Sequence, residues 1–274
     1  LIFQGILLME VFNMTNQLFI NNEFIESQSK ETMDVINPAT GEAFDTITLA
    51  TEEEVNDAIE KSQQAQLEWE RVPQPTRAEH VKLLIPLLEK NRDEIAQLYV
   101  KEQGKTLAEA YGEIDKSISF IDYMTSLSMS DKGRVLQNSI ANETIQIINK
   151  PIGVTAGIVP WNAPILVLMR KVIPAIVTGC SVVIKPSEET TLLTLRLAEL
   201  FRASTIPAGL IQIVPGTGET VGTQLASHKD IQLISLTGSM RAGKSVYENA
   251  AQTVKKVNLE LGGRSEERRV GKEC

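Results

Sequence analysis

The sequence predicts an α/β fold in which a mostly parallel sheet is covered by helices on both faces. After Pro151, short apolar segments alternate with longer segments of helical periodicity as far as Leu259, and glycine, proline or polar clusters separate them. Parallel strands need a crossover connection, and right-handed helical crossovers cover both sides of the sheet. The alternation therefore favours this fold class over an all-α or all-β one.

The segment before this region predicts two small antiparallel units. Leu18 to Phe24 alternates around an Asn-Asn pair, and Val35-Ile36 leads into the turn sequence Asn-Pro-Ala-Thr-Gly at 37–41. Asparagine, proline and glycine are the residues that tight turns require. We expect short strands on either side of each turn.

Three amphipathic helices are predicted next. Thr51 forms a capping box with Glu54 and starts a helix that runs toward Trp69. A second helix is expected from about Thr76 to a glycine stop at Gly104, and a third passes through the apolar positions 110, 114, 118 and 121. Stripes of this kind are usually core, so we assign them no functional role.

The segments Val135 to Ile140 and Thr144 to Asn149 are predicted to be the two strands of a hairpin between the helical region and the alternating region. This hairpin is a candidate domain boundary or interface arm. In the alternating region the expected strands are 154–159, 181–184, 211–214, 231–236 and 254–259. The expected helices are 164–178, closed by Gly179, then 191–201, 219–226 and 241–251.

Composition excludes several classes of function. The chain is 42% hydrophobic and 23% charged, with a net charge of −8 and no basic stripe, so a nucleic-acid partner is disfavoured. Its two cysteines and two histidines have no metal-ligand spacing, and no apolar stretch approaches the roughly 20 residues of a membrane span. We expect a globular protein of the cytoplasm, with no metal site and no membrane partner.

Both ends of the chain have unusual sequences. Residues 1–13 lack the features of a signal peptide, and the codons for Met9 to Val11 can contain a purine-rich ribosome-binding run, so we expect translated leader and a start at Met14. Residues 264–274, RSEERRVGKEC, have no strand or helix period and match the translation of a DNA string that resembles a sequencing adapter. We expect this tail to be an artefact.

In a parallel sheet, ligands bind beyond the carboxyl ends of the strands, so the residues that follow each strand are the candidate site. The first strand ends in the segment 159–162, Val-Pro-Trp-Asn, where Asn162 is either a turn former or an amide donor to a developing oxyanion. The second ends in 185–188, Lys-Pro-Ser-Glu. Lys185 and Glu188 are either a solvated turn or a ribose-recognition pair.

The remaining strand ends carry glycine, hydroxyl and carboxylate groups. The third strand leads into a GxGxxxG pattern at 216–222, which serves either tight turns or phosphate binding. The fourth ends in Thr-Gly-Ser at 237–239, where Ser239 is a helix cap or a diphosphate contact. The last carries Glu260 between two leucines, a strand-end residue or, if partly buried with a raised pKa, a general base.

In their order along the chain, the motifs PWN, KPSE, PGTGETVG, TGS and LELGG resemble those of the NAD(P)-dependent aldehyde dehydrogenases. The resemblance covers essentially all of Met14 to Gly263, including NPATGE at 37–42. It implies the Rossmann-like aldehyde dehydrogenase fold, cut before its catalytic domain. Residues 14–134 would be the N-terminal part of the cofactor-binding domain, 135–150 an oligomerisation hairpin of a homo-dimer or homo-tetramer, and 151–263 the NAD-binding core.

The resemblance also implies roles for residues. Asn162 would donate to the thiohemiacetal oxyanion, Glu260 would activate water for deacylation, and Lys171 would order the catalytic groups. Residues at all the strand ends would line the cofactor site: Val159, Pro160, Trp161, Lys185, Ser187, Glu188, Gly218, Gly222, Thr237, Gly238, Ser239, Leu261 and Gly262. Glu188 favours NAD over NADP, because a 2′-phosphate beside it would be an unpaired second anion.

The family's nucleophilic cysteine is expected well after Glu260, in a separate catalytic domain. Cys274 lies too close to Glu260 and inside the foreign tail, and Cys180 is expected to be a buried, inert thiol. The chain as printed is therefore expected to be inactive. Alternatives are a short protein that binds nucleotide without catalysis, and an enzyme of related fold that transfers the acyl group to CoA or reduces an acyl phosphate. The glutamate of LELGG favours water over CoA.

Within the family, the segment 121–124, the KPSE turn and the GETVG helix start are most similar to bacterial lactaldehyde and glycolaldehyde dehydrogenases. This similarity implies a small hydroxyaldehyde substrate that is oxidised to a carboxylic acid with NAD and water. Succinate-semialdehyde and betaine-aldehyde dehydrogenases stay open as alternatives.

Overall fold

A computed structural model describes residues 17–130, 133–138, 140 and 143–262. Within these residues a seven-stranded sheet has the order β11-β10-β7-β8-β9-β1-β2. The strands β7 (Val154–Ile158), β8 (Ser181–Lys185), β9 (Ile211–Ile213), β10 (Leu233–Ser239) and β11 (Lys256–Gly262) all pair in parallel. The predicted α/β class and its parallel sheet are confirmed.

The N-terminal strands extend this sheet. Strands β1 (Gln17–Ile20) and β2 (Glu23–Glu26) form the predicted hairpin, and Asn21 and Asn22 take the positive φ values of 55° and 65° that a two-residue turn requires. Strand β1 then pairs antiparallel with β9, which joins the first part of the chain to the later core. Strands β3 (Thr32–Asn37) and β4 (Glu42–Thr48) form a separate hairpin around the predicted turn.

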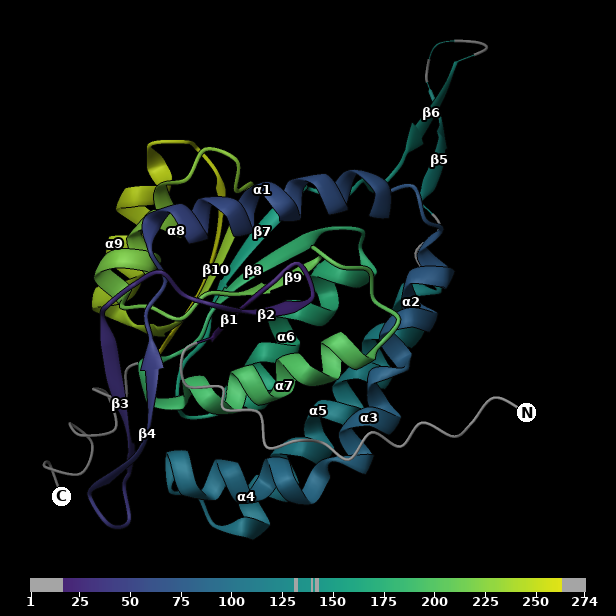
Figure 1. The fold of residues 1–274 in the computed structure, drawn as a ribbon. Helices are drawn as coiled ribbons and strands as arrows, with labels where there is room; N and C mark the ends of the chain where they lie inside the picture. Colours follow the sequence, from purple (N-terminus) through teal and green to yellow (C-terminus); the bar gives the residue numbers. More distant parts are fainter. Residues whose placement is uncertain (1–16, 131–132, 139, 141–142, 263–274) are drawn as a thin grey trace, which may run out of the picture.

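Helices cover both faces of the sheet, as predicted (Figure 1). On one face lie α1 (Glu52–Trp69), α8 (Thr223–Ser227) and α9 (Met240–Ala251), whose buried apolar residues share a cluster with alternate residues of β1, β7, β8 and β10. The helices α6 (Pro164–Val177) and α7 (Thr191–Ala203) pack on the other face. Helix α1 begins with the predicted capping box of Thr51 and Glu54.

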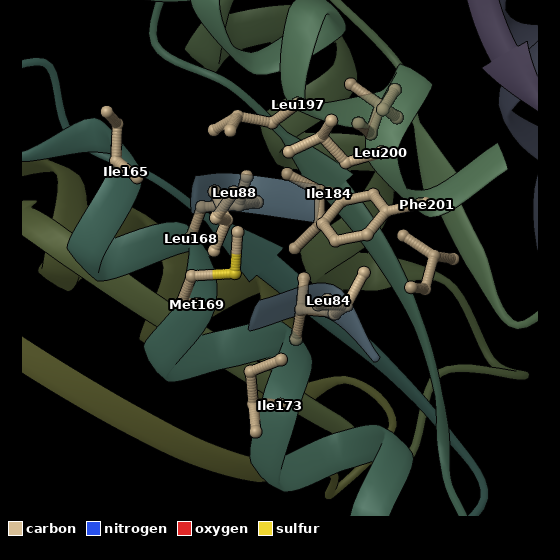
Figure 2. Packing of buried hydrophobic residues seen from close by; sticks show 14 of the residues in the cluster. Leu84, Leu88, Ile165, Leu168, Met169, Ile173, Ile184, Leu197, Leu200 and Phe201 are labelled. Carbon is tan, nitrogen blue, oxygen red and sulfur yellow. The ribbon is translucent and has the colours of Figure 1, made fainter. Parts of the chain in front are cut away.

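An outer helical layer packs over α6 and α7. It consists of α2 (Gln74–Lys82), α3 (Leu84–Lys90), α4 (Arg92–Gln103) and α5 (Leu107–Ser128). Leu84 and Leu88 of α3 meet Leu168 and Phe201 of the inner helices in one apolar cluster (Figure 2). This layer matters for function because, as described below, its side chains reach the starts of both inner helices.

The expectation of one helix from Thr76 to Gly104 is wrong, since this segment forms the three helices α2, α3 and α4. In a continuous helix the N–H of residue 86 would donate to the Lys82 carbonyl. Pro86 has no N–H, and its ring would clash with that carbonyl, so α2 ends at Lys82. At the second break the side chain of Asn91 donates to the Leu87 carbonyl at 2.7 Å. Gly104 does end the helical segment, with a φ of 86°.

Strands β5 (Arg134–Gln137) and β6 (Thr144–Ile147) pair antiparallel in a hairpin that stands away from the body of the molecule (Figure 1). All residues of these two strands are exposed. The predicted first strand was longer, and part of its end falls outside the described residues. The expected leader 1–13, the start at Met14, the tail 264–274 and Cys274 also lie outside them.

Candidate nucleotide-binding site

The carboxyl edge of the parallel sheet contains a topological switch point. From β7 the chain continues to β8 and β9 on one side, and β10 and β11 then pair on the other side of β7. Connections that leave in opposite directions open a crevice between β7 and β10, where ligands bind in open α/β sheets. The predicted site residues follow these five strands and therefore lie along one edge.

A cavity of about 420 Å³ opens at this edge, beside α8 and α9. Eight of the predicted cofactor residues line it: Val159, Lys185, Ser187, Glu188, Gly218, Gly222, Thr237 and Gly238. The predicted residues Pro160, Trp161, Ser239, Leu261 and Gly262 are not among its lining residues, and 54% of the Trp161 side chain is exposed. The sequence thus identified eight of the eighteen lining residues, and the other five predicted cofactor residues lie outside the lining.

Lys185 and Glu188 form a polar pair at the cavity wall. Lys185 is only 2% exposed; its Nζ donates to the Pro186 carbonyl at 2.8 Å and lies 3.2 Å from Glu188 Oε2. Burial lowers the pKa of Lys185, and the charge of Glu188 opposes this effect. The other carboxylate oxygen of Glu188 accepts the Gly218 N–H at 3.0 Å. The pair therefore connects the end of β8 to the glycine-rich turn after β9.

The glycine-rich turn differs from the helix predicted over 219–226. Residues Gly218–Gly222 form a π-helical turn in which the Gly222 N–H donates to the Thr217 carbonyl, and α8 starts only at Thr223. The additional residue of the GxGxxxG pattern is accommodated by this wider turn. The glycine that packing requires most is Gly216, because a Cβ there would lie 2.1 Å from Val221 Cγ2.

The fourth strand end leads directly into α9. The hydroxyl of Ser239 accepts the Ala242 N–H at 3.2 Å and caps the helix, so the structural role foreseen for this serine is confirmed. On the same helix, Arg241, Ser245 and Asn249 line the cavity, and the sequence analysis missed them. Their spacing of four residues places them on one helix face, which is the sequence signal that identifies them.

The predicted catalytic residues lie near the crevice but outside this cavity. Lys171 Nζ, in the middle of α6, donates to Ser235 Oγ at 2.9 Å and to Thr237 Oγ1 at 3.2 Å. It lines a second cavity of about 250 Å³, formed by α6 and the sheet, which Cys180 also lines. Burial lowers the pKa of Lys171 from 10.5 to about 8, and the charge of Glu260 raises it in part. Lys171 and Glu260 are therefore electrostatically coupled.

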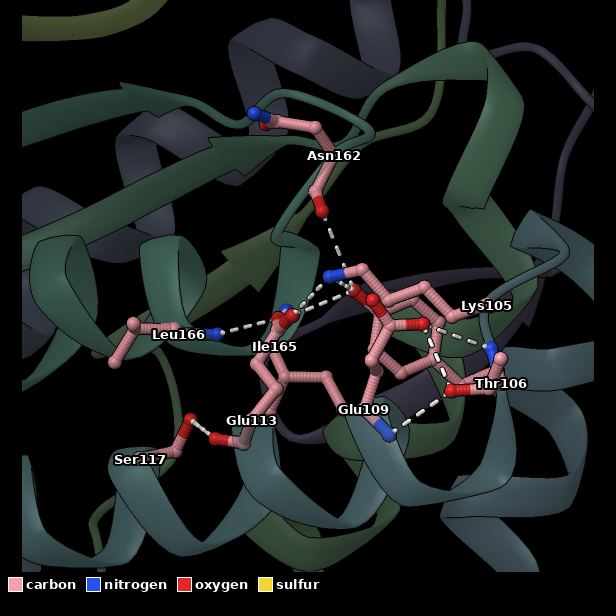
Figure 3. Close-up of polar contacts among 9 residues, drawn as sticks. Lys105, Thr106, Glu109, Glu113, Ser117, Asn162, Ile165 and Leu166 are labelled. Atoms are coloured by element: carbon pink, nitrogen blue, oxygen red, sulfur yellow. Dashed lines mark hydrogen bonds and ion pairs between the residues drawn. The ribbon is translucent and has the colours of Figure 1, made fainter.

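Glu260 itself is exposed, because within the described residues β11 is the edge strand of the sheet. The described residues therefore leave the Glu260 side chain unburied. Asn162 is also exposed, and its side-chain amide points away from the polar cluster beneath it (Figure 3). The described chain thus leaves both groups accessible from solvent.

Cys180 is a free cysteine, 3% exposed, and it precedes β8 at the amino edge of the sheet, opposite the strand ends that carry the site. The expectation of a buried thiol is confirmed. Among the described residues, no three or more His, Cys, Asp or Glu side chains are grouped to hold a metal ion. The helices in that part of the chain include none both long and apolar enough to cross a membrane.

A switch-point crevice, a glycine-rich turn, a capped helix start and a carboxylate at the end of the second strand are features that α/β domains use to bind dinucleotides. The family model described as "Aldehyde dehydrogenase family" matches residues 24–267. The chain belongs to the aldehyde dehydrogenase family, as its motifs implied.

Three relatives illustrate the similarity. The chain is 36% identical to the NADP(+)-dependent succinate-semialdehyde dehydrogenase of Escherichia coli K12 and 35% identical to the lactaldehyde dehydrogenase of the same organism, over 90% of the chain. These matches cover 51% and 52% of the two relatives. A structure of betaine aldehyde dehydrogenase from Staphylococcus aureus in complex with NAD+ superposes with a TM-score of 0.88 at 35% identity, over 90% of this chain and 50% of that one. The chain therefore spans about half the length of the relatives it matches.

Proposed function

We propose that this segment is the cofactor-binding part of an enzyme that oxidises a small hydroxyaldehyde, such as lactaldehyde or glycolaldehyde, to a carboxylic acid with NAD and water. The observation that carries the proposal is the convergence of Lys185, Glu188 and Gly218 on one cavity at the switch point. The family membership supplies the reaction class, the oxidation of aldehydes.

The residues present fit a dinucleotide. Gly218 lines the cavity and nothing lies within 4 Å of the position its Cβ would take, so a ligand can approach the backbone closely. The Glu188 carboxylate at the same wall is suited to accept ribose hydroxyls. The first turn of α9, which follows Ser239, presents backbone N–H groups and a positive dipole end to a diphosphate.

The chemistry then divides among this chain's residues. NAD, when bound, would supply the acceptor for the hydride that leaves the former aldehyde carbon. When a cysteine thiolate outside the described residues adds to the aldehyde carbon, the Asn162 amide would donate to the resulting oxyanion and stabilise its negative charge. Glu260, open to solvent, accepts a proton from the water that releases the acid. Lys171 holds a buried ammonium group against β10, close enough to Glu260 for that charge to raise the Lys171 pKa.

Nucleotide binding to the chain tests the cofactor proposal. We expect calorimetric titration to give at least about tenfold tighter binding of NAD+ than of NADP+, because charge-assisted hydrogen bonds contribute about 1.5–3 kcal/mol each. Glu188→Gln keeps the side-chain length but removes the charge and should erase most of this preference. Glu189→Gln is the matched control, since Glu189 is the neighbouring carboxylate and is exposed. A wild-type preference for NADP+, or an equal effect of both variants, would contradict the proposal.

The similarity to lactaldehyde dehydrogenase supports a short hydroxyaldehyde, and the equally close succinate-semialdehyde dehydrogenase makes a semialdehyde the second candidate. Measuring kcat/KM of the whole protein for lactaldehyde, glycolaldehyde, succinate semialdehyde and betaine aldehyde ranks these four candidate substrates.

We further propose that the described segment alone does not turn over aldehyde, because its cysteine is buried at the opposite edge of the sheet. Formation of NADH by the printed chain, lost in Cys180→Ser, would refute that statement.

The hairpin of β5 and β6 is proposed to pair with another copy in a homo-dimer or homo-tetramer. Apolar side chains on it, Val135, Ile145, Ile147 and Ile148, are between 42% and 69% exposed. Exposed apolar strands are typical of protein interfaces. Replacing Val135 and Ile145 by serine should dissociate the assembly in analytical ultracentrifugation.

A cytoplasmic location of the whole protein is proposed from its low cysteine content and tested by cell fractionation.

A further inference from the structure

Two inner helices begin without a cap from their own sequence. Neither Ala163 before α6 nor Thr190 before α7 makes a side-chain hydrogen bond to the first turn. Two carboxylates of the outer layer take over this role. One oxygen of Glu113 in α5 accepts the N–H groups of Ile165 and Leu166 at 3.0 and 3.1 Å. Glu102 in α4 accepts those of Leu192 and Leu193, both at 2.8 Å.

The Glu113 carboxylate is held in place by two further groups. Its second oxygen accepts the Tyr99 hydroxyl at 2.6 Å and lies 2.8 Å from Lys105 Nζ, which also contacts the Tyr99 hydroxyl at 2.8 Å. Tyr99 is fully buried and Glu113 is 5% exposed. Gly104, with a φ of 86°, turns the chain after α4 so that Lys105 reaches back to this pair. Figure 3 shows this cluster against the first turn of α6.

The cluster lies directly beneath the loop that carries the proposed oxyanion donor. Asn162 precedes the capped amides by three and four residues, and its backbone carbonyl lies 3.5 Å from the Tyr99 hydroxyl. Its side chain points the opposite way (Figure 3). The cluster thus contacts the backbone of Asn162 on one side, while the side-chain amide of Asn162 points to the other side.

We propose that Glu113, fixed by Tyr99 and Lys105, is a positioning residue that sets the orientation of Asn162. The role of Asn162 rests on the proposed function, whereas the anchoring of its loop does not. Glu102 is the counterpart at the neighbouring strand end, because the helix start it caps follows the turn that carries Glu188. Glu113 therefore anchors the helix start next to the proposed oxyanion donor Asn162. Glu102 anchors the helix start next to the proposed ribose contact Glu188.

Amide hydrogen exchange of the 274-residue chain tests whether these glutamates anchor the first turns of α6 and α7. In Glu113→Ala the amides of Ile165 and Leu166 lose their acceptor and should exchange at least about tenfold faster, while the first turn of α7 is unchanged. Glu102→Ala should give the reverse pattern. Glu113→Gln keeps an acceptor oxygen and should restore much of the protection. Glu109→Gln is the matched control, since Glu109 lies one turn earlier on α5 and caps only its own helix at Thr106.

Kinetics of the whole protein test the positioning. Glu113→Ala should lower kcat by about tenfold or more while the Kd for NAD+ stays within about twofold, and Glu102→Ala should instead weaken NAD+ binding. Tyr99→Phe, which removes only the hydroxyl, serves if Glu113→Ala does not fold, and should lower kcat in the same direction. Unchanged exchange at Ile165, or faster exchange with unchanged kcat, overturns the proposal. Failure of the wild type to bind NAD+ would refute the proposed function alone, since the exchange result is independent of it.

Discussion

The buried Lys171 side chain gives the sharpest test of how this site is built. Lys171 is 9% exposed, and its described hydrogen-bond partners are the neutral hydroxyls of Ser235 and Thr237. Burial lowers its pKa from 10.5 to about 8, and at ~1.36 kcal/mol for each pH unit the charged form costs the folded state about 3 kcal/mol. Lys171→Met keeps the length and removes the charge.

The two lost hydrogen bonds offset part of this gain, at about 1 kcal/mol each. We therefore expect Lys171→Met to raise the free energy of unfolding at pH 7 by about 1 kcal/mol. The sign of the pH dependence follows from the lowered pKa. Between about 8 and 10.5 the unfolded chain holds a proton that the folded chain has released, so the wild type gains stability as pH rises and the variant does not.

Urea unfolding of both proteins at about pH 7 and about pH 9.5 measures the difference directly. The linkage relation changes the stability difference by about 2 kcal/mol between these two conditions, so Lys171→Met should be more stable than the wild type by about 1 kcal/mol at about pH 7 and less stable by about 1 kcal/mol at about pH 9.5. Lys116→Met, at an exposed position of α5, is the control and should show no such change. A variant that is less stable than the wild type by the same amount at both pH values would refute the reasoning.

Four further variants test local features by chemical denaturation. Burial raises the pKa of Glu102 from 4.5 to about 8, so wild-type stability should fall relative to Glu102→Gln as pH rises through this interval. Gly112→Ala, inside α5 with nothing within 4 Å of the new Cβ, should stabilise by about 0.5–1 kcal/mol. Gly209→Ala should destabilise by more than ~2 kcal/mol, because its φ is 86° and the Cβ would lie 2.7 Å from Ala65 Cβ. Val254→Gly should stabilise by about 1 kcal/mol, because Val254 is exposed with a φ of 53°.

Local patterns were sufficient to predict the parallel strands, the two turns and eight of the eighteen residues that line the cavity. The Asn21-Asn22 pair and Gly104 each define a backbone conformation within a few residues, and the alternation after Pro151 fixes a parallel sheet. Once the strands are parallel, every strand end lies at one edge, so Lys185 and Gly218 meet although they are far apart in sequence. Fold and candidate site therefore followed from the same inference.

What the sequence did not reveal depends on contacts between distant segments. The capping of α6 by Glu113 joins residues 52 positions apart, and no local pattern distinguishes this glutamate from an exposed one on the same helix. The exposure of Glu260 depends on which strand is at the edge of the sheet, which strand periodicity does not determine. The break at Pro86 was readable locally, but the apolar stripe that continues through it favoured a single helix.

The buried cations Arg77 and Lys171 differ in their hydrogen-bond partners, and this difference indicates a structural role for Arg77 and a functional role for Lys171. Arg77 donates to the carbonyls of Val177 and Val72 at the amino edge of the sheet, which satisfies its guanidinium within the scaffold. Lys171 donates only to neutral hydroxyl oxygens among its described partners, and it lies close enough to Glu260 for that charge to shift its pKa. A buried charge without a buried counterion lowers stability, so its presence needs another reason. Its contact with Thr237, the register partner of Glu260 in the neighbouring strand, supplies one, because it places a cation beside the proposed base.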